Sequence, residues 1–331
     1  MTALLDKTQL YQLLLFFRAA GRQRILLLSS PLKPANPPPT SNMQTLEDLL
    51  KSDSELASLP EIYIRVSELL ESERSSARQI GEVVETDPAL TARTLKMVNS
   101  AYYGLQREVA SVAQAISILG RDRLRQILIG TVMGGIFKSF DNEVLPLQAF
   151  WHHSVKTALL SRYMAQHSAL DDLAETLFTA GLLHQIGSLI LAHRLPQQAR
   201  QVEQAVSYDH EDLCMAETRL IGFTHCQTGA SFICHWGLPR VLADCARHYL
   251  TPREAGENEQ LVELIFMANR LAYFDELIEQ DKITDLLDQL SGLKALGLSV
   301  EGITDACILA EQHVFEVMDT LGMNPMVIET D

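Results

Sequence analysis

Hydrophobic residues recur at the three- and four-residue spacing of amphipathic helices along most of the chain between Leu46 and about Thr251. In the segment DPALTARTLKMVNSAYYG, Asp87 is a favoured N-cap residue and Pro88 suits the first helical position. The expected apolar face of this helix consists of Leu90, Thr94, Met97, Val98 and Ala101. We expect Gly104 to end the helix, because glycine readily adopts the left-handed conformation found after helix C-termini.

The next segment, SVAQAISILG, repeats this arrangement, with Ser111 as the N-cap and Gly120 as the C-terminal stop. A second helical region begins with LVELIFMANRLAYFDELIEQ and continues to the C-terminus. No alternating, β-rich run of useful length interrupts the series. The pattern therefore predicts an all-α fold.

Residues 1–42 differ in composition from the rest of the chain. They carry five basic residues against Asp6 alone, and they end in the proline-rich stretch SSPLKPANPPPTSN, which is typical of an extended tether. We expect a disordered extension here, with two interpretations: Met43 is the natural start, or the segment supplies a short amphipathic docking helix. Arginines interrupt its apolar patch well short of the roughly 20 apolar residues that a membrane span requires.

Charge and cysteine content narrow the function classes. At 331 residues and 47% hydrophobic content the chain is long enough for about two packed domains. Its net charge of −15 opposes phosphate backbones, so nucleic-acid binding is not expected. Most of the net negative charge lies in residues 251–331. It forms either a solvated helical face or a partner-binding surface. Five cysteines without a CxxC pair indicate neither a disulfide framework nor a zinc ribbon, and fit a reduced cytosol.

Four of the ten histidines are predicted to face the interior of the helical domain. His153 lies on a face of mainly small residues, and His184 shares a face with Leu177, Ala180 and Gly181. His225 follows the N-cap Thr224, and His248 lies near the end of a later helix; the other six histidines are interpreted as surface or incidental residues. Each of the four is either a hydrogen-bonded core residue or a metal ligand, since imidazole is the commonest ligand of transition metals.

Taken together, six blocks of the chain resemble the HDOD domain, the output-domain branch of the HD phosphohydrolase superfamily. The blocks are DPALTARTLKMVNSAYYG, AISILG, FWHHSVKTALLSRYMA, AGLLHQIGSLIL, THCQTGASFICHWGLP and ARHYL, in that order. The resemblance covers roughly residues 55–275. It implies three regions: the extension 1–42, an HDOD domain over 43–275, and an acidic helical segment over 276–331.

The resemblance implies an all-α, bundle-like domain with additional C-terminal helices, from a bacterial cytoplasmic protein of signalling and regulation. In active HD enzymes the metal ligands are a first histidine, a His-Asp doublet and a later aspartate. By position, His153 matches the first histidine and His184 the doublet histidine, while Gln185 and Asn269 stand where the two aspartates would be. His225 and His248 match the extra histidines of the cyclic-di-GMP phosphodiesterase branch.

Two carboxylates have thus become amides, and amides lack the negative charge that sustains a metal cluster and its activated water. The sequence therefore favours a pseudoenzyme without a cofactor, a regulatory domain that acts through a protein partner or a small ligand in the former cleft. The alternative is a weak or altered metal-dependent phosphohydrolase in which His153, His184, His225 and His248 hold one divalent transition metal.

Three arginines in GRDRLRQ suggest a further feature. Arg121, Arg123 and Arg125 form either a local basic patch, for an anionic ligand or a partner's carboxylate, or an ordinary solvated helix surface.

Overall fold

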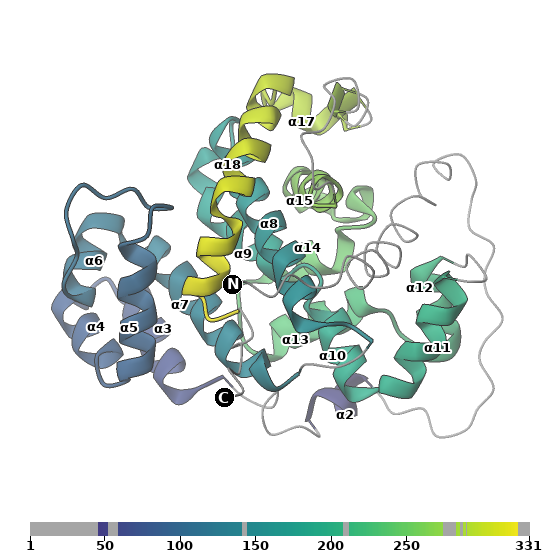
Figure 1. The fold of residues 1–331 in the computed structure, drawn as a ribbon, viewed down its shortest axis with the longest axis horizontal. Helices are drawn as coiled ribbons and strands as arrows, with labels where there is room; N and C mark the ends of the chain where they lie inside the picture. The colour runs from purple at the N-terminus through teal and green to yellow at the C-terminus, as the bar shows by residue number, and fades with distance from the viewer. Residues whose placement is uncertain are drawn as a thin grey trace, which may run out of the picture.

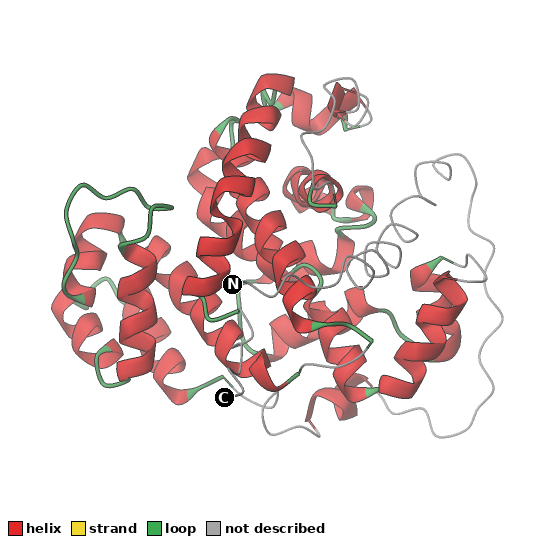
Figure 2. Ribbon diagram, viewed as in Figure 1, coloured by secondary structure: helices red, strands yellow, loops and turns green. Residues whose placement is uncertain are grey.

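The computed structural model describes residues 46–51, 59–140, 144–207, 212–273, 283–284, 287–288 and 290–323. These residues form helices joined by loops, with no strand among them, as Figure 2 shows. The all-α prediction is therefore confirmed. The predictions for the extension 1–42 and for Met43 lie outside the described residues.

Short helices of the N-terminal half gather at one end of the molecule, to the left in Figure 1. Their bounds are α3 Glu61–Glu71, α4 Ala77–Val84, α5 Pro88–Val98, α6 Val112–Leu119 and α7 Arg121–Ile136. Helix α2, Leu46–Lys51, lies apart from this group and contacts α13, His225–His235. The predicted caps are present: the Asp87 side chain accepts from two backbone amides of α5, and the Ser111 side chain accepts from one in α6. Gly120 ends α6 with φ 85°.

The end of α5 differs from the prediction. The helix stops at Val98, Ala101 is exposed, and Gly104, with φ 58°, lies in the turn beyond. The cause is Asn99, whose side-chain amide both donates to and accepts from the backbone of Val109 and so fixes the loop that follows the helix.

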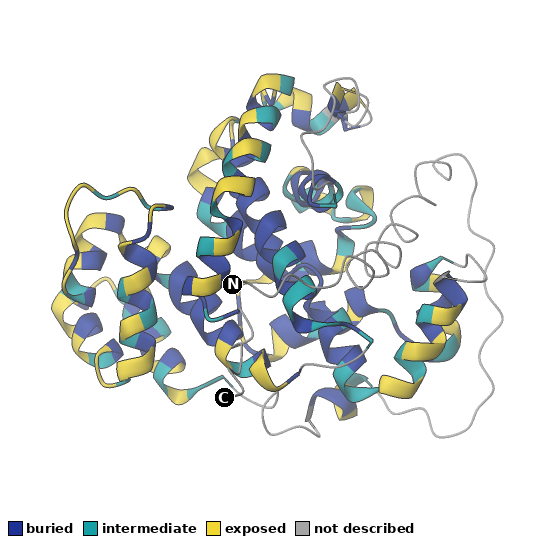
Figure 3. Cartoon of the chain, viewed as in Figure 1, coloured by how far each residue is buried: buried dark blue, intermediate teal, exposed yellow. Residues whose placement is uncertain are grey.

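The helices that follow in the chain form the rest of the molecule. Their bounds are α8 Leu147–Gln166, α9 Ala174–Leu183, α10 Ile186–Arg194, α11 Pro196–Ser207, α12 Leu213–Leu220, α13 His225–His235, α14 Arg240–His248, α15 Glu259–Leu271, α17 Ser291–Ala295 and α18 Val300–Thr320. α8 is buried along most of its length (Figure 3) and packs against α9, α15 and α18. A hydrophobic cluster continuous from Leu49 to Met323 makes up the core.

Two glycines allow the helices that carry the histidines to come together. At Gly181 in α9 a Cβ atom would lie 2.7 Å from the Cα atom of Ala158 in α8. At Gly187 in α10 a Cβ atom would collide with the backbone carbonyl of His225 at the start of α13. Both helix pairs are therefore in backbone contact, and the histidines at their ends are held at fixed separations.

The acidic C-terminal helix α18 lies along α8 and is part of the same core, since Val314, Val317 and Met318 are fully buried. Part of its charge is used within the chain. Glu311 pairs with the buried Lys156 at 2.7 Å, and Asp319 pairs with Lys96 at 2.5 Å. Within the described ranges no helix combines the length and the apolar character needed to cross a membrane.

Candidate functional site

Two histidines from consecutive central helices converge on one amide. His153 lies in α8, His184 directly follows α9, and Asn269 lies in α15. The Nε2 atoms of His153 and His184 lie 2.9 and 3.1 Å from the Oδ1 atom of Asn269. All three side chains are buried. The residues that the resemblance places in one metal site therefore do lie together.

Gln185 and Tyr273 complete this cluster. The Nε2 atom of Gln185 lies 3.4 Å from the Oδ1 atom of Asn269 and 3.3 Å from the Tyr273 hydroxyl. Its Oε1 atom is buried without a hydrogen-bond partner among the described residues. The Tyr273 ring stacks on His153 with ring centroids 4.3 Å apart. Sequence reasoning missed Tyr273, although it follows Asn269 by four residues and so lies one helical turn further on.

Burial determines the protonation of the two rings. Burial, with the neighbouring His184 as the next cause, lowers the pKa of His153 well below its ordinary value. Burial also lowers the pKa of His184 to about 4, although a hydrogen bond to the Gly181 carbonyl acts in the opposite direction. Both imidazoles are therefore neutral at pH 7, and each carries one N–H and one lone pair.

His225 makes a separate set of contacts. Its Nδ1 atom and its backbone nitrogen lie 2.7 and 3.0 Å from the Oε2 atom of Glu217, a buried residue of α12. Its Nε2 atom lies 2.7 Å from the Tyr249 hydroxyl. Burial alone would lower the pKa of His225, but the Glu217 carboxylate raises it to about 9. The sequence did not predict this contact between the Glu217 carboxylate and His225, one of the four candidate histidines.

Tyr249, and not His248, occupies the buried position at the end of α14. The side chain of His248 is 21% exposed and its Nδ1 atom lies 4.0 Å from the Oε2 atom of Glu254. The Tyr249 ring is fully buried, edge-on to His184 with centroids 4.9 Å apart and 5.8 Å from the His225 centroid. Successive helical residues point about 100° apart, so His248 and Tyr249 cannot both face inward. The structure thus places His248 at a partly exposed position, while Tyr249 is the residue at this helix end whose ring lies against His184 and His225.

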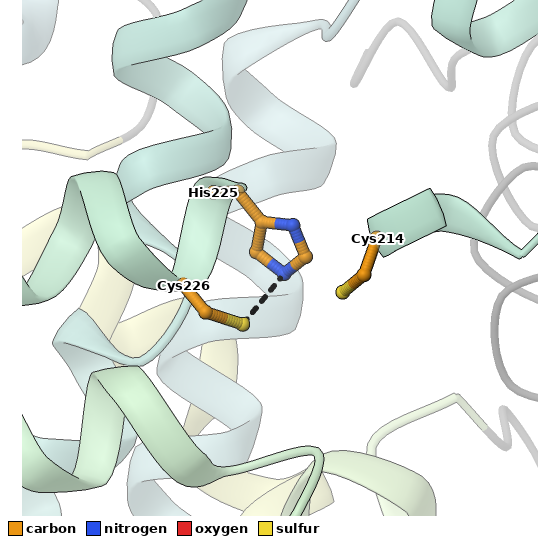
Figure 4. A group of neighbouring side chains, drawn as sticks. All are labelled: Cys214, His225 and Cys226. Atoms are coloured by element: carbon orange, nitrogen blue, oxygen red, sulfur yellow. Dashed lines mark hydrogen bonds between the residues drawn. The ribbon is translucent and has the colours of Figure 1, made fainter. Parts of the chain in front are cut away.

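The structure assembles a different group of metal-ligating side chains. Among the described residues, the His, Cys, Asp and Glu side chains whose ligand atoms gather within 4.8 Å of one another are Cys214, His225 and Cys226 (Figure 4). The four predicted histidines do not form such a group there. Sequence reasoning passed over both cysteines because neither belongs to a CxxC motif. The available signal was the His225-Cys226 doublet one short loop after a helical cysteine.

The three arginines of α7 are neither a free basic patch nor a simple solvated face. Arg121 donates to the carbonyl oxygens of Leu70, Ser72 and Ser75, which joins α7 to the end of α3. Arg123 pairs with Glu175 at 3.3 Å. Arg125 lies 3.8 Å from Asp122 in the same helix. Arg121 therefore has a structural role.

Comparison with known proteins identifies the family and the fold. The HDOD domain model matches residues 56–252. A crystal structure from Shewanella amazonensis SB2B, of a protein named "Putative phosphohydrolase", is 27% identical with a TM-score of 0.67, and the match covers 83% of this chain and 97% of that one. A structure from Marinobacter aquaeolei VT8, named "Putative signal transduction protein", is 23% identical with a TM-score of 0.61, covering 97% of this chain and 67% of that one.

A curated relative from Treponema pallidum (strain Nichols), named "Uncharacterized protein", is 22% identical over 221 residues. These residues make up 66% of this chain and 42% of the relative, so the chain spans less than half of that protein's length.

Proposed function

The chain belongs to the HDOD family, and from that premise we propose that it is a non-catalytic regulatory domain of a signalling pathway. It acts through contacts with a protein partner or through a small ligand bound in the former catalytic cleft. The observation that carries this proposal is the meeting of His153 and His184 at Asn269, an amide, in a buried position.

The hydrogen bonds of His184 determine which ring nitrogen faces Asn269. Its Nδ1 atom lies 2.6 Å from the Gly181 carbonyl, which only accepts, so Nδ1 carries the single proton of the neutral ring. Its Nε2 atom therefore presents a lone pair to Asn269. A half-turn of the Asn269 side chain exchanges the amide oxygen and nitrogen. The two N–H groups then donate to His184 and His153, which an aspartate could not do.

The same exchange in Gln185 accounts for its unpaired oxygen. A half-turn of the side chain places Oε1 where Nε2 lies, 3.3 Å from the Tyr273 hydroxyl, which can donate to it. With both amides turned, Tyr273 donates to Oε1 of Gln185, and the Gln185 amide nitrogen takes the place that the oxygen occupied.

The donor set does not fit a hydrolytic metal centre. The side chains that meet there, His153, His184, Asn269 and Gln185, are all neutral at pH 7. A divalent ion in this buried place would keep its charge uncompensated, and no anionic ligand would hold a water nucleophile.

The competing function is a weak metal-dependent phosphohydrolase with one transition metal. It is favoured by the convergence of two Nε2 atoms on one point, and by the name of the Shewanella protein, which describes that protein alone. In this case, metal would bind to the lone pairs of His153 and His184, and its removal would lower the thermal stability of the protein.

Metal analysis and a turnover assay distinguish the two functions. The metal content of protein purified without chelator should be the same in the wild type and in the His153→Ala and His184→Ala variants, and manganese should leave the thermal midpoint of the wild type unchanged. Cyclic di-GMP and a generic phosphodiester should not be hydrolysed with manganese, iron or magnesium. Hydrolysis by the wild type that disappears in both His153→Ala and His184→Ala variants would overturn the proposal, whereas activity that survives both substitutions comes from a contaminant.

A further inference from the structure

The loop between α12 and α13 places two cysteines and a histidine around one point. Cys214 lies in the first turn of α12, while His225 and Cys226 open α13. Gly222, with φ 99°, lies in the connecting turn, and the Thr224 capping box fixes the start of α13. Figure 4 shows the sulfur of Cys214 and that of Cys226 on opposite helices, both directed toward the ring of His225.

We propose that Cys214, His225 and Cys226 bind a thiophilic divalent cation of the zinc type. This site is distinct from the His153 and His184 cluster and does not depend on the proposed regulatory function. Two thiolates and one imidazole form a common zinc donor set, with a fourth position left for water or an added ligand.

The geometry requires little rearrangement. The Sγ atom of Cys226 lies 3.4 Å from the Nε2 atom of His225. A sulfur and a nitrogen bound to one tetrahedral zinc ion at its usual bond lengths are about 3.6 Å apart. The three ligand atoms lie within 4.8 Å of one another. Closure therefore needs a movement of roughly 1 Å, given zinc–sulfur bonds of ~2.3 Å, and Cys214, a partly exposed residue in the first turn of α12, can supply it.

Glu217 orients the histidine for this role. Its carboxylate accepts from Nδ1 of His225 at 2.7 Å and from the backbone N–H of the same residue at 3.0 Å. Such a carboxylate fixes the ring and directs Nε2 toward the metal in many zinc proteins. Glu217 also follows Cys214 by three residues and thus lies on the same face of α12. One face of α12 therefore supplies both Cys214, a proposed ligand, and Glu217, which orients the ligand His225.

The donor charges also suit a divalent cation. Two thiolates neutralise it, and His225 must give up its Nε2 proton when the cation binds. Tyr249 is the competing partner of His225, because its hydroxyl lies 2.7 Å from Nε2 when no cation is bound. The cation must displace this hydroxyl, and removal of the hydroxyl should therefore strengthen binding.

The test uses the full chain, reduced and stripped of metal. Zinc affinity is measured by competition with a chromophoric chelator, and cobalt(II) serves as the spectroscopic probe. We expect one equivalent of zinc, and a cobalt spectrum with thiolate charge transfer and strong visible bands of tetrahedral coordination. Cys214→Ser and Cys226→Ser should each remove the charge-transfer signal in part and weaken zinc binding at least tenfold. Cys234→Ser, at an exposed cysteine of the same α13, is the matched control and should bind as the wild type does.

Two further variants keep the test independent of folding defects. Glu217→Gln should weaken zinc binding about 10- to 100-fold, the range seen for groups that orient a metal-bound histidine. Tyr249→Phe should strengthen it. Absence of bound zinc in a reduced wild type with native circular dichroism overturns the proposal. Equal zinc affinity in the wild type and in both cysteine variants would also overturn it. So would a disulfide between Cys214 and Cys226, if it were the only change on exposure to metal and air.

Discussion

A methyl group on Gly181 would lie 2.7 Å from the Cα atom of Ala158, so α9 and α8 touch along their backbones. His184 follows α9 and His153 lies one helical turn and a half before Ala158 in α8. This backbone contact therefore sets the separation of the two imidazoles that meet at Asn269.

Gly181→Ala should lower the free energy of unfolding by about 1–3 kcal/mol, because the added methyl group meets backbone atoms that cannot give way. This loss outweighs the higher helix propensity of alanine, worth up to about 1 kcal/mol. Urea denaturation measures the difference. Gly135→Ala in α7 is the matched control, since its methyl group would meet only the Arg93 guanidinium at 3.8 Å. It should be neutral or stabilising, and the same loss in both variants would contradict the backbone contact.

Acid should destabilise the protein through His184. Its pKa is about 4 in the folded chain and about 6.5 in the unfolded chain, so the unfolded state binds more protons between these values. The free energy of unfolding therefore falls as pH drops from about 6.5 to 4, by about 3 kcal/mol if this group acts alone. Denaturation at several pH values should show a shallower fall for His184→Gln. A chemical shift of His184 that titrates near pH 6.5 in the folded protein would contradict this assignment.

Alkali should destabilise the protein through His225 in its metal-free form. Glu217 raises the pKa of this ring to about 9, so the ion pair contributes fully below about pH 6.5 and is lost as pH rises through 9. The contribution is at most about 3 kcal/mol. Glu217→Gln should remove the dependence of the unfolding free energy on pH in this window. Parallel curves for variant and wild type would show that the pair does not titrate there.

Restoring the two carboxylates should restore a cation site. In the double variant Gln185→Asp with Asn269→Asp, two anions join His153 and His184 in a buried position. Without metal the variant should unfold more readily, because buried unpaired carboxylates are costly. Manganese should then raise its thermal midpoint by several degrees and leave that of the wild type unchanged. Gln312→Glu, on the exposed face of α18, controls for added charge. An equal response of wild type and double variant would contradict the proposed loss of the metal site.

Much of the fold was predictable because its signals are local. Asp87, Ser111 and Thr224 cap the helices that they were expected to cap, and Gly120 and Gly237 end helices with positive φ. His153 and His184 are buried as expected, although α8 and α9 are buried on all sides and not on one face. The error at Ala101 arose because Asn99 bonds to Val109, a contact made across a loop that periodicity does not describe.

The site was less predictable because its contacts are distant in sequence. Family resemblance placed His153, His184, Gln185 and Asn269 together, which the structure confirms. The family resemblance also indicated His248. At the end of α14, however, the next residue, Tyr249, is the one whose side chain is fully buried. Glu217 and Cys214 lie in α12 and Cys226 lies in α13, and no sequence motif indicates that these two helices bring the three residues together.

The single phenol of Tyr249 stands between the two clusters, bonded to His225 on one side and edge-on to His184 on the other. A cation that displaces the Tyr249 hydroxyl from His225 acts on the same side chain whose ring packs against His184. Binding at the two clusters is coupled to the extent that displacement of this hydroxyl also moves the tyrosine ring, and any such coupling is reciprocal.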